Sequence, residues 1–274
     1  SQGEGLGNQF LSHIRETAAI VHVVRCYENP DITHVTGNID PARDIEIIET
    51  ELMLADLETV TKKLEKLNKD IKSKEKSVIA EKELADRVQK HLEQGKPART
   101  LEASAEEKEI LKNFFLITAK PVLYACNISE KDLPQMTNKY VSLVEEIAKN
   151  ENAQVIPVCA KIEAELSELS EEDRKTFLSD LGLSQPGLNR LIKSGYKLLG
   201  LITFLTAGQD ECRAWTIKNG FFAPQAAGVI HTDFERGFIR AEVMTYEDIF
   251  KLGSEKAVKE AGLLRSEGKD YLVK

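Results

Sequence analysis

The sequence predicts an α/β fold with a parallel sheet, a helical hairpin inserted into it, and a small α+β unit at the C-terminal end. Strand-like and helical segments alternate between residues 121 and 159, as they do in a βαβ unit. Apolar residues recur at alternating gaps of three and four from residue 57, which is coiled-coil spacing. After residue 200 short strands and turns replace the long helices, so we place a domain boundary there.

Length and composition indicate a soluble globular protein. The 274 residues are enough for two or three structural units. A hydrophobic fraction of 42% and a charged fraction of 30% are typical of this class, and no apolar run reaches the ~18 residues of a membrane span. The net charge of −8 argues against a general attraction to nucleic acid but does not exclude a local basic surface.

The cysteines are expected to be buried free thiols in a reducing compartment rather than disulfides or metal ligands. None forms a CxxC pair, and each lies within or at the end of a strand-like run: Cys26, Cys126, Cys159 and Cys212. The chain starts at Ser1 with neither a signal peptide nor an initiator Met. We therefore expect a cytoplasmic protein whose sequence begins within a domain.

The first half of the chain predicts a helix, a strand and then the hairpin. Residues 6–18 have helical spacing, residues 20–26 form an apolar strand-like run, and Pro41 after Asp40 is a good helix start. The two hairpin arms are marked by apolar residues at helical spacing, which are Leu57, Val60, Leu64, Leu67, Ile71, Leu84, Val88 and Leu92. The Gly95-Lys96-Pro97 segment ends the second arm, so the arms are expected to pack antiparallel.

The middle of the chain predicts the parallel sheet. Its expected elements, after a helix near residues 104–113, are a strand over 121–127, a helix near 135–149 and a strand over 154–159. The carboxyl ends of parallel strands meet at one edge, where ligands bind. Asn127 and the Cys159-Ala160 pair are therefore expected at the same edge.

The end of the chain predicts more helices and then the α+β unit. Helices continue to about residue 199. Strands follow over 201–205 and 212–217 around a turn at 208–210, then a short helix near Gln225 and strands near Phe238 and Tyr271.

The segment Asn127-Ile128-Ser129-Glu130 follows a core strand, where translation-factor NTPases carry the base-reading NKxD motif. In NKxD the aspartate accepts hydrogen bonds from the ring N–H and the exocyclic amine of guanine. Here the fourth residue is Glu130, which removes the basis for preferring guanine and favours ATP. Taken alone, such a segment is usually a helix start, with Ser129 as its N-cap.

Two weaker motifs support the same interpretation. Val158-Cys159-Ala160-Lys161 ends the next strand, where a short SA-type base-binding motif would lie. Gly3, Gly5 and Gly7 precede a helical segment and resemble the stretch after the switch II DxxG of Obg-type NTPases. Glycines suit a loop that rearranges when the γ-phosphate is lost, although such a turn alone is more often an ordinary loop.

Together these residues resemble the YchF or Obg-like ATPase family, over essentially all 274 residues. Pro186-Gly187-Leu188-Asn189-Arg190-Leu191-Ile192 resembles the family helix that leads to a C-terminal TGS domain. Three segments look like that TGS domain itself, namely Phe204–Gly208, Arg213–Ile217 and Ala223–Val243.

The resemblance implies a division of the chain into three parts. Residues 1–50 and 115–199 would form a P-loop NTPase core of the G-domain type that lacks its first strands. Residues 51–114 would form the inserted coiled-coil hairpin. Residues 200–274 would form the TGS domain, an α+β unit of the ubiquitin-like β-grasp type that stops before its final strand.

The resemblance also gives His34 a catalytic role. In this family a histidine in a mobile loop is thought to replace the glutamine that positions the attacking water in related GTPases. A neutral imidazole can orient or deprotonate water near pH 7. From its spacing alone, a solitary loop histidine is more often exposed and inert. His231 lies in the TGS signature, where an interaction or structural role is expected.

The first hairpin arm is locally basic. Thr61 to Lys76 holds seven lysines and three acidic residues. Such a stripe can lie along RNA phosphates, but a solvated coiled-coil face is the slightly favoured alternative on sequence alone.

The sequence contains no G-x-x-x-x-G-K-[ST] phosphate-binding loop. Its Gly-Lys pairs, Gly95-Lys96 and Gly268-Lys269, are followed by proline and aspartate rather than by a hydroxyl residue. The family's phosphate loop, switch I and DxxG aspartate would precede Ser1. No metal ligands are therefore expected within the chain, and those for Mg²⁺ are expected upstream of it.

The function implied by the resemblance is hydrolysis of ATP to ADP and phosphate by a cytoplasmic, monomeric, ribosome-binding switch, with the large subunit as its expected partner. His34 would be catalytic. The base site would consist of Asn127, Ile128, Glu130, Cys159 and Ala160. The alternative, motivated by the missing phosphate loop, is a ribosome- or RNA-binding module without enzymatic activity.

Overall fold

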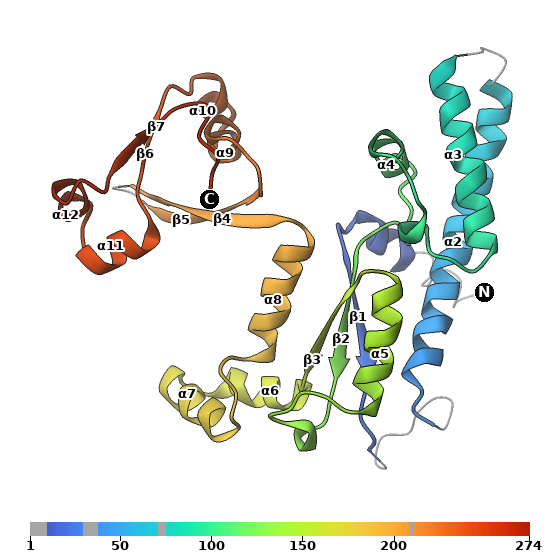
Figure 1. The fold of residues 1–274 in the computed structure, drawn as a ribbon, viewed down its shortest axis with the longest axis horizontal. Coiled ribbons are helices and arrows are strands. Elements are labelled where there is room, and N and C mark those ends of the chain that lie inside the picture. The colour runs from blue at the N-terminus through green and yellow to red at the C-terminus, as the bar shows by residue number, and fades with distance from the viewer. Residues whose placement is uncertain (1–9, 30–37, 71–74, 209–210) are drawn as a thin grey trace. The chain divides into compact units, whose positions relative to one another are not determined.

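The computed structural model describes residues 10–29, 38–70, 75–208 and 211–274 (Figure 1). The chain divides into two compact units, Ser1–Leu198 and Leu199–Lys274. The first unit contains a parallel sheet with its helices and a helical hairpin. The second unit is built from short strands and short helices.

A three-stranded parallel sheet forms the centre of the first unit. Its strands are β1 (Ile20–Arg25), β2 (Val122–Asn127) and β3 (Gln154–Val158), in the order β1-β2-β3. The parallel pairing expected from the βαβ pattern is confirmed. The first five residues of β2 are buried, because this central strand is covered on both faces. Asn127 pairs with the last residue of each neighbouring strand, so the three carboxyl ends meet at one edge.

Helices flank this sheet. Residues 10–16 are helical and precede β1. α5 (Lys139–Asn150) connects β2 to β3, and its buried residues recur at helical spacing, as an amphipathic helix requires. Three further helices follow β3, namely α6 (Ala160–Glu168), α7 (Glu171–Asp180) and α8 (Gly187–Leu198).

The helical hairpin consists of α2 (Pro41–Asp70) and α3 (Lys76–Glu93), which lie side by side (Figure 1). The apolar positions expected between the arms are buried there, namely Val60, Leu64, Leu67, Leu84, Val88 and Leu92. Leu57 is partly buried, and Ile71 lies outside the described residues. The first turns of α2 instead bury Ile45 in the core of the sheet, so one continuous helix crosses the boundary expected at residue 51.

Buried polar contacts join the hairpin to the sheet. The chain leaves α3 through a 3-10 turn, η2 (Ala98–Thr100), and then forms α4 (Ala105–Lys112). Asp56 of α2 is fully buried, and its carboxylate accepts hydrogen bonds from the N–H groups of Ile117 and Thr118 at 2.8 and 2.7 Å. These contacts fix the segment between α4 and β2 to the middle of α2.

The second unit begins with an antiparallel pair, β4 (Leu201–Ala207) and β5 (Cys212–Lys218). The helix expected near Gln225 is α9 (Ala223–Ile230). It is followed by four short elements and a last strand, namely α10 (Thr232–Arg236), β6 (Ala241–Val243), α11 (Tyr246–Leu252), α12 (Glu255–Glu260) and β7 (Arg265–Glu267), with β6 paired to β7.

The two strands expected near Phe238 and Tyr271 are displaced. Gly237 caps α10, so the chain enters β6 only at residue 241. Near Tyr271 the backbone forms an isolated bridge between Phe222 and Leu272, because the Tyr271 N–H closes a turn onto Gly268 after β7 has ended.

The cysteines are free, and three of them, Cys26, Cys126 and Cys159, are buried as expected. Cys212 is exposed, and the prediction that it is buried was wrong. It is the first residue of β5, where β5 is joined to β4, and the first three residues of this strand are exposed. Among the described residues no helix is both long and apolar enough to cross a membrane.

Candidate functional site

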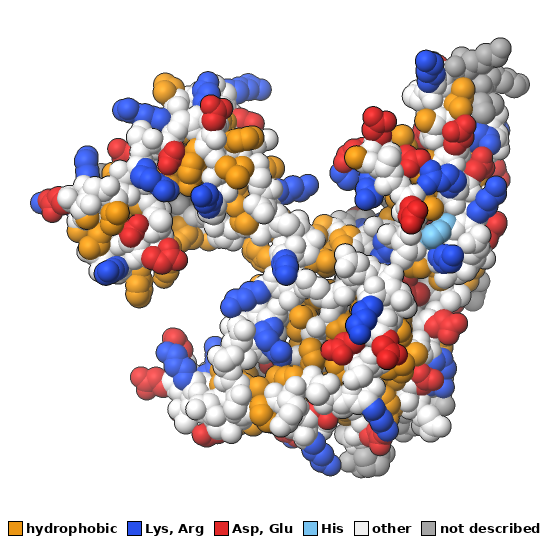
Figure 2. Space-filling view, in the orientation of Figure 1, with side chains coloured by type: hydrophobic (Ala, Val, Ile, Leu, Met, Phe, Trp, Pro, Cys, Tyr) orange, Lys and Arg blue, Asp and Glu red, His pale blue; other side chains and the backbone are white. Residues whose placement is uncertain are grey.

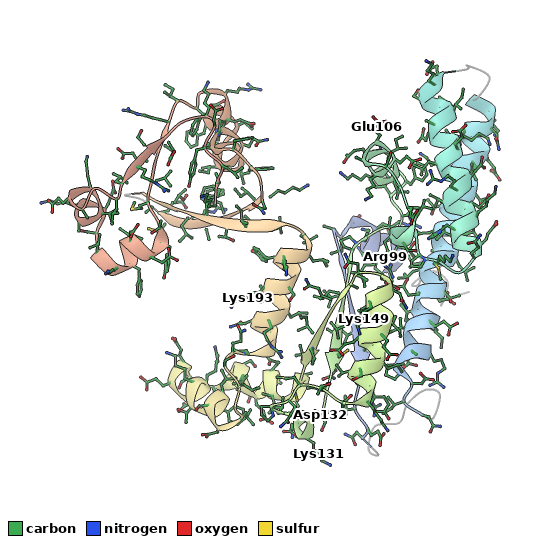
Figure 3. All side chains as sticks on the ribbon, in the orientation of Figure 1. Arg99, Glu106, Lys131, Asp132, Lys149 and Lys193 are labelled. Atoms are coloured by element: carbon green, nitrogen blue, oxygen red, sulfur yellow. The ribbon has the colours of Figure 1, made fainter. Side chains whose placement is uncertain are left out.

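The carboxyl edge of the parallel sheet gathers the residues that the sequence indicated. Asn127 ends β2, Ala160 begins α6 directly after β3, and Glu130 lies in a 3-10 helix, η3 (Glu130–Asp132). Lys131 and Asp132 of η3 mark this edge in Figure 3, and Arg99 lies toward the other end of the strands. The topology thus joins two loops that are 33 residues apart in the sequence.

Asn127 links these two loops directly. Its side-chain Oδ1 accepts a hydrogen bond from the backbone N–H of Ala160 at 3.1 Å. An asparagine side chain carries one acceptor oxygen and one donor NH₂ group. With the oxygen engaged inside the protein, the NH₂ group is the part that Asn127 can offer to a ligand.

The first turn of α6 uses two of its backbone donors internally. The N–H of Ala160 binds the side chain of Asn127. The N–H of Glu163 binds the carbonyl of Cys159. Burial raises the pKa of the Cys159 thiol, which therefore stays protonated.

Glu130 and Lys161 form an ion pair across the edge. The Lys161 Nζ lies 2.9 Å from each carboxylate oxygen of Glu130. Both side chains are accessible, with exposed fractions of 65% for Lys161 and 44% for Glu130. The edge therefore presents an anionic acceptor and a cationic donor next to each other.

The remaining residues of the segment fix its backbone. Ile128 is 2% exposed and packs in the core of the sheet, so only its main chain faces the edge, and its N–H binds the carbonyl of Val158 at 3.0 Å. Ser129 caps η3, as expected: its hydroxyl accepts from the N–H of Lys131, and its own N–H donates to the Asp132 carboxylate. Glu130 is thus held on a rigid turn.

Comparison with known proteins shows strong similarity along the whole chain. The chain is 50% identical over 274 residues to the ribosome-binding ATPase YchF of Bacillus subtilis (strain 168), covering 100% of this chain and 75% of the relative. The same figures hold for the ribosome-binding ATPase YchF of Escherichia coli O157:H7. The chain belongs to the YchF family.

Two further matches agree with the YchF assignment. A family model named YchF-GTPase_C, described as a protein of unknown function (DUF933), matches residues 201–274. The solved structure of the Schizosaccharomyces pombe YchF GTPase superposes with a TM-score of 0.83 at 38% identity, covering 97% of this chain and 72% of that one. The bacterial relatives are named ATPases and the yeast protein is named a GTPase, so the names of the relatives differ in the base.

Other predicted site residues lie outside the described part of the YchF chain. These are His34, in the gap between residues 29 and 38, and Gly3, Gly5 and Gly7, before residue 10. In the segments that the structure covers, no group of three or more His, Cys, Asp or Glu side chains could hold a metal ion.

Sequence reasoning missed two residues of the site. Lys161 ends the Val158–Lys161 motif, and the sequence does not indicate that it contacts Glu130. Asn138 was not singled out, yet its Nδ2 donates to the Cys26 carbonyl at 2.8 Å and to the Asp132 carboxylate at 3.0 Å, which ties η3 to β1. An asparagine directly before a helical run is an N-cap signal that could have marked it.

A cavity of about 700 Å³ lies at the amino end of the strands, away from this edge. Two of its cationic side chains are already engaged. Arg99 binds Glu151, and Lys120 donates to backbone carbonyls of residues 14 and 15 at 2.7 Å. The carboxyl edge remains the better candidate site because its donor and acceptor groups are accessible.

Proposed function

We propose that this YchF protein binds and hydrolyses ATP and binds the ribosome, and that the carboxyl edge of the sheet reads the adenine base. The observation that carries the proposal is the pairing of Asn127 with Ala160 beside an accessible Glu130. The bacterial relatives, which are named ribosome-binding ATPases, support the same activity.

Asn127 is suited to recognise a purine of either kind. Its free NH₂ group can donate to N7, which both adenine and guanine carry as an acceptor. This contact selects purines but does not separate them. Discrimination must therefore come from the neighbouring groups.

Glu130 and the first turn of α6 favour adenine. Guanine presents O6, an acceptor that needs a donor, whereas adenine presents an amine at the same position. The N–H of Ala160, the first backbone donor of that turn, is engaged with Asn127, and Glu130 supplies an acceptor. A base whose polar groups are left unpaired on burial is strongly disfavoured.

The phosphate chemistry would involve residues that the structure does not describe. We propose His34 as the group that orients or deprotonates the attacking water, which a neutral imidazole can do near pH 7. ATP is expected with Mg²⁺, and among the described residues no group of three or more His, Cys, Asp or Glu side chains could hold this ion. The sequence also has no G-x-x-x-x-G-K-[ST] loop, so turnover is to be measured in a form of the protein that carries one.

The test of the activity is steady-state hydrolysis of ATP and GTP. We expect ATP to be used with a kcat/KM at least about tenfold higher. His34→Ala should lower kcat by about 10²- to 10⁴-fold, the usual contribution of general acid–base catalysis. Equal use of GTP would contradict the choice of base, and an unimpaired His34→Ala would contradict the catalytic role.

Ribosome binding is proposed through the hairpin and the second unit. In Figure 2 cationic and anionic side chains are interspersed along the hairpin. Lys62 and Lys63 of the basic arm are paired with Glu58 and Glu81, at 2.5 and 2.6 Å. Lys66 is exposed and can reach a phosphate. Because some of the lysines are already paired with glutamates, few remain to bind phosphates. We therefore expect the affinity for the ribosome to depend only modestly on salt concentration.

Co-sedimentation of the chain with ribosomes across a salt series tests this part. We expect binding at low salt that weakens as salt rises, and a Lys66→Glu variant that binds less. The absence of binding even at low salt would contradict the proposal. Ribosome binding by a form that carries a phosphate-binding loop but hydrolyses no nucleotide would instead support the alternative of a non-catalytic binding module.

A further inference from the structure

The ion pair between Glu130 and Lys161 has no evident role in holding the fold. Both side chains are accessible, and exposed ion pairs contribute little to stability. The pair nevertheless joins two separate elements, η3 after β2 and α6 after β3. Glu130 stands on a turn capped by Ser129, and Lys161 stands in the first turn of a helix, so both ends are preorganised.

We propose that Lys161 is a specificity-determining residue of the base site, which orients the Glu130 carboxylate and supplies the donor beside it. This inference rests on the proposed function, because it assigns a second residue to the same adenine-reading edge. Lys161 ends the Val158–Lys161 motif, but the sequence alone gives it no role in reading the base.

The chemistry of the adenine edge calls for such a pair. Adenine presents its amine, a donor, next to ring N1, an acceptor. A carboxylate alone satisfies the amine but faces the N1 lone pair. An ammonium group has three N–H donors, and those of Lys161 face both oxygens of Glu130 while one donor remains. The pair therefore offers an acceptor and a donor side by side, matching adenine.

The same pair acts against guanine. Guanine presents two adjacent donors, its ring N–H and its exocyclic amine, and both need acceptors. A free carboxylate can accept from both, as the aspartate of NKxD does. Because Lys161 contacts both oxygens of Glu130, guanine would have to displace it. Removing the lysine charge should therefore weaken ATP use and improve GTP use at once.

The experiment compares kcat and KM for ATP and GTP in the wild-type protein, Lys161→Met, Lys161→Arg and a control, in the form that carries a phosphate-binding loop. The control is Lys175→Met, since Lys175 also pairs with a glutamate on the surface, Glu171, within α7 and away from the edge. We expect Lys161→Met to lower the ATP:GTP ratio of kcat/KM about tenfold through KM, with kcat unchanged. Lys161→Arg should keep most of the preference, and the control should match the wild type.

The outcomes separate the inference from the function on which it rests. A wild-type protein that prefers ATP, with Lys161→Met keeping the full preference, would overturn the role of Lys161 and leave the proposed function standing. A wild-type protein without a preference would overturn the choice of base itself. A fall in kcat with unchanged KM would also contradict the inference, because base recognition acts before the chemical step. Equal thermal midpoints for all variants are expected, since the pair is exposed.

Discussion

Buried charges hold the hairpin to the sheet at the scale of single residues. The side chain of Arg99 is 7% exposed and lies 2.7 Å from a carboxylate oxygen of Glu49 and 2.7 Å from one of Glu151. Glu49 belongs to α2, and Glu151 follows α5, so one guanidinium joins three segments. Figure 3 places Arg99 at the base of the hairpin.

Replacing Arg99 should destabilise the first unit strongly. Arg99→Met leaves two buried carboxylates without their partner, which typically costs about 3–5 kcal/mol. Urea unfolding followed by far-UV circular dichroism measures the change. Lys112→Met, which removes an exposed partner of Glu109, is the matched control and should leave stability unchanged. Equal stability of the two variants would contradict the structural role.

His22 should make stability depend on pH. Its pKa is lowered from 6.5, first by burial and then by the nearby Arg99 charge. The unfolded chain therefore takes up the proton first as the pH falls. The stability that neutral His22 provides is present above pH 6.5 and is lost as the pH falls below it toward the folded pKa.

The check is the free energy of unfolding of wild type and His22→Gln between about pH 5 and pH 8. The wild type should lose more stability than the variant on the acidic side of this range. Glu49 titrates in the opposite sense, since burial raises its pKa. Its contribution is common to both proteins and cancels in the difference. Parallel curves of unfolding free energy against pH for the wild type and His22→Gln would contradict the prediction.

The long helix α2 is the main structural feature at the scale of elements. Its first turns pack in the core of the sheet and its later turns pack on α3. Asp56 fixes the middle of the helix through the backbone of Ile117 and Thr118. Local unfolding of the α2–α3 interface should therefore not extend past Asp56 into the sheet.

Leu84→Ala should open the hairpin while the sheet stays folded. Leu84 is 1% exposed, and truncation of a buried leucine costs about 2–5 kcal/mol. Hydrogen exchange should rise in α3 and in the part of α2 beyond Asp56, while β2 stays protected. Ile79→Ala, at a position on the same helix that is 37% exposed, is the control. Increased exchange in β2 would show that the anchor does not isolate the two cores.

The sequence predicted elements well where a period extends over many residues. The heptads of α2 and α3 and the βαβ run of the sheet are of this kind. The seven-residue α11 and the six-residue α12 were missed, because such short helices show little periodicity. The sequence likewise predicted only part of the candidate site. The common edge of the strands followed from topology, but no sequence rule relates Glu130 to Lys161, whose contact depends on side-chain placement.

The chain has two units of unequal core size at the scale of the whole molecule. The first contains two hydrophobic clusters. In the described part of the second unit, the buried hydrophobic residues are Ile217, Ala223, Ala226 and Val258. A smaller buried apolar surface gives a smaller stabilisation. We therefore expect the second unit to unfold at the lower temperature.

Tryptophan fluorescence can follow this unit alone. The sequence has one tryptophan, Trp215, and it lies in β5. Its fluorescence transition should precede the main far-UV transition on heating. Leu84→Ala should lower the midpoint of the main transition and leave the fluorescence transition in place. Coincident transitions in both proteins would contradict independent unfolding.

The central claim is that the Asn127–Glu130 edge reads adenine, and nucleotide binding without turnover tests it most directly. The measurement is the Kd for ADP and for GDP by titration calorimetry, in the form of the protein with a phosphate-binding loop, for wild type and Glu130→Asp. We predict at least about tenfold tighter binding of ADP by the wild type. Glu130→Asp should reduce the difference between the Kd for ADP and the Kd for GDP, because it restores the aspartate of the guanine-reading motif. Wild-type binding of GDP as tight as that of ADP would contradict the account.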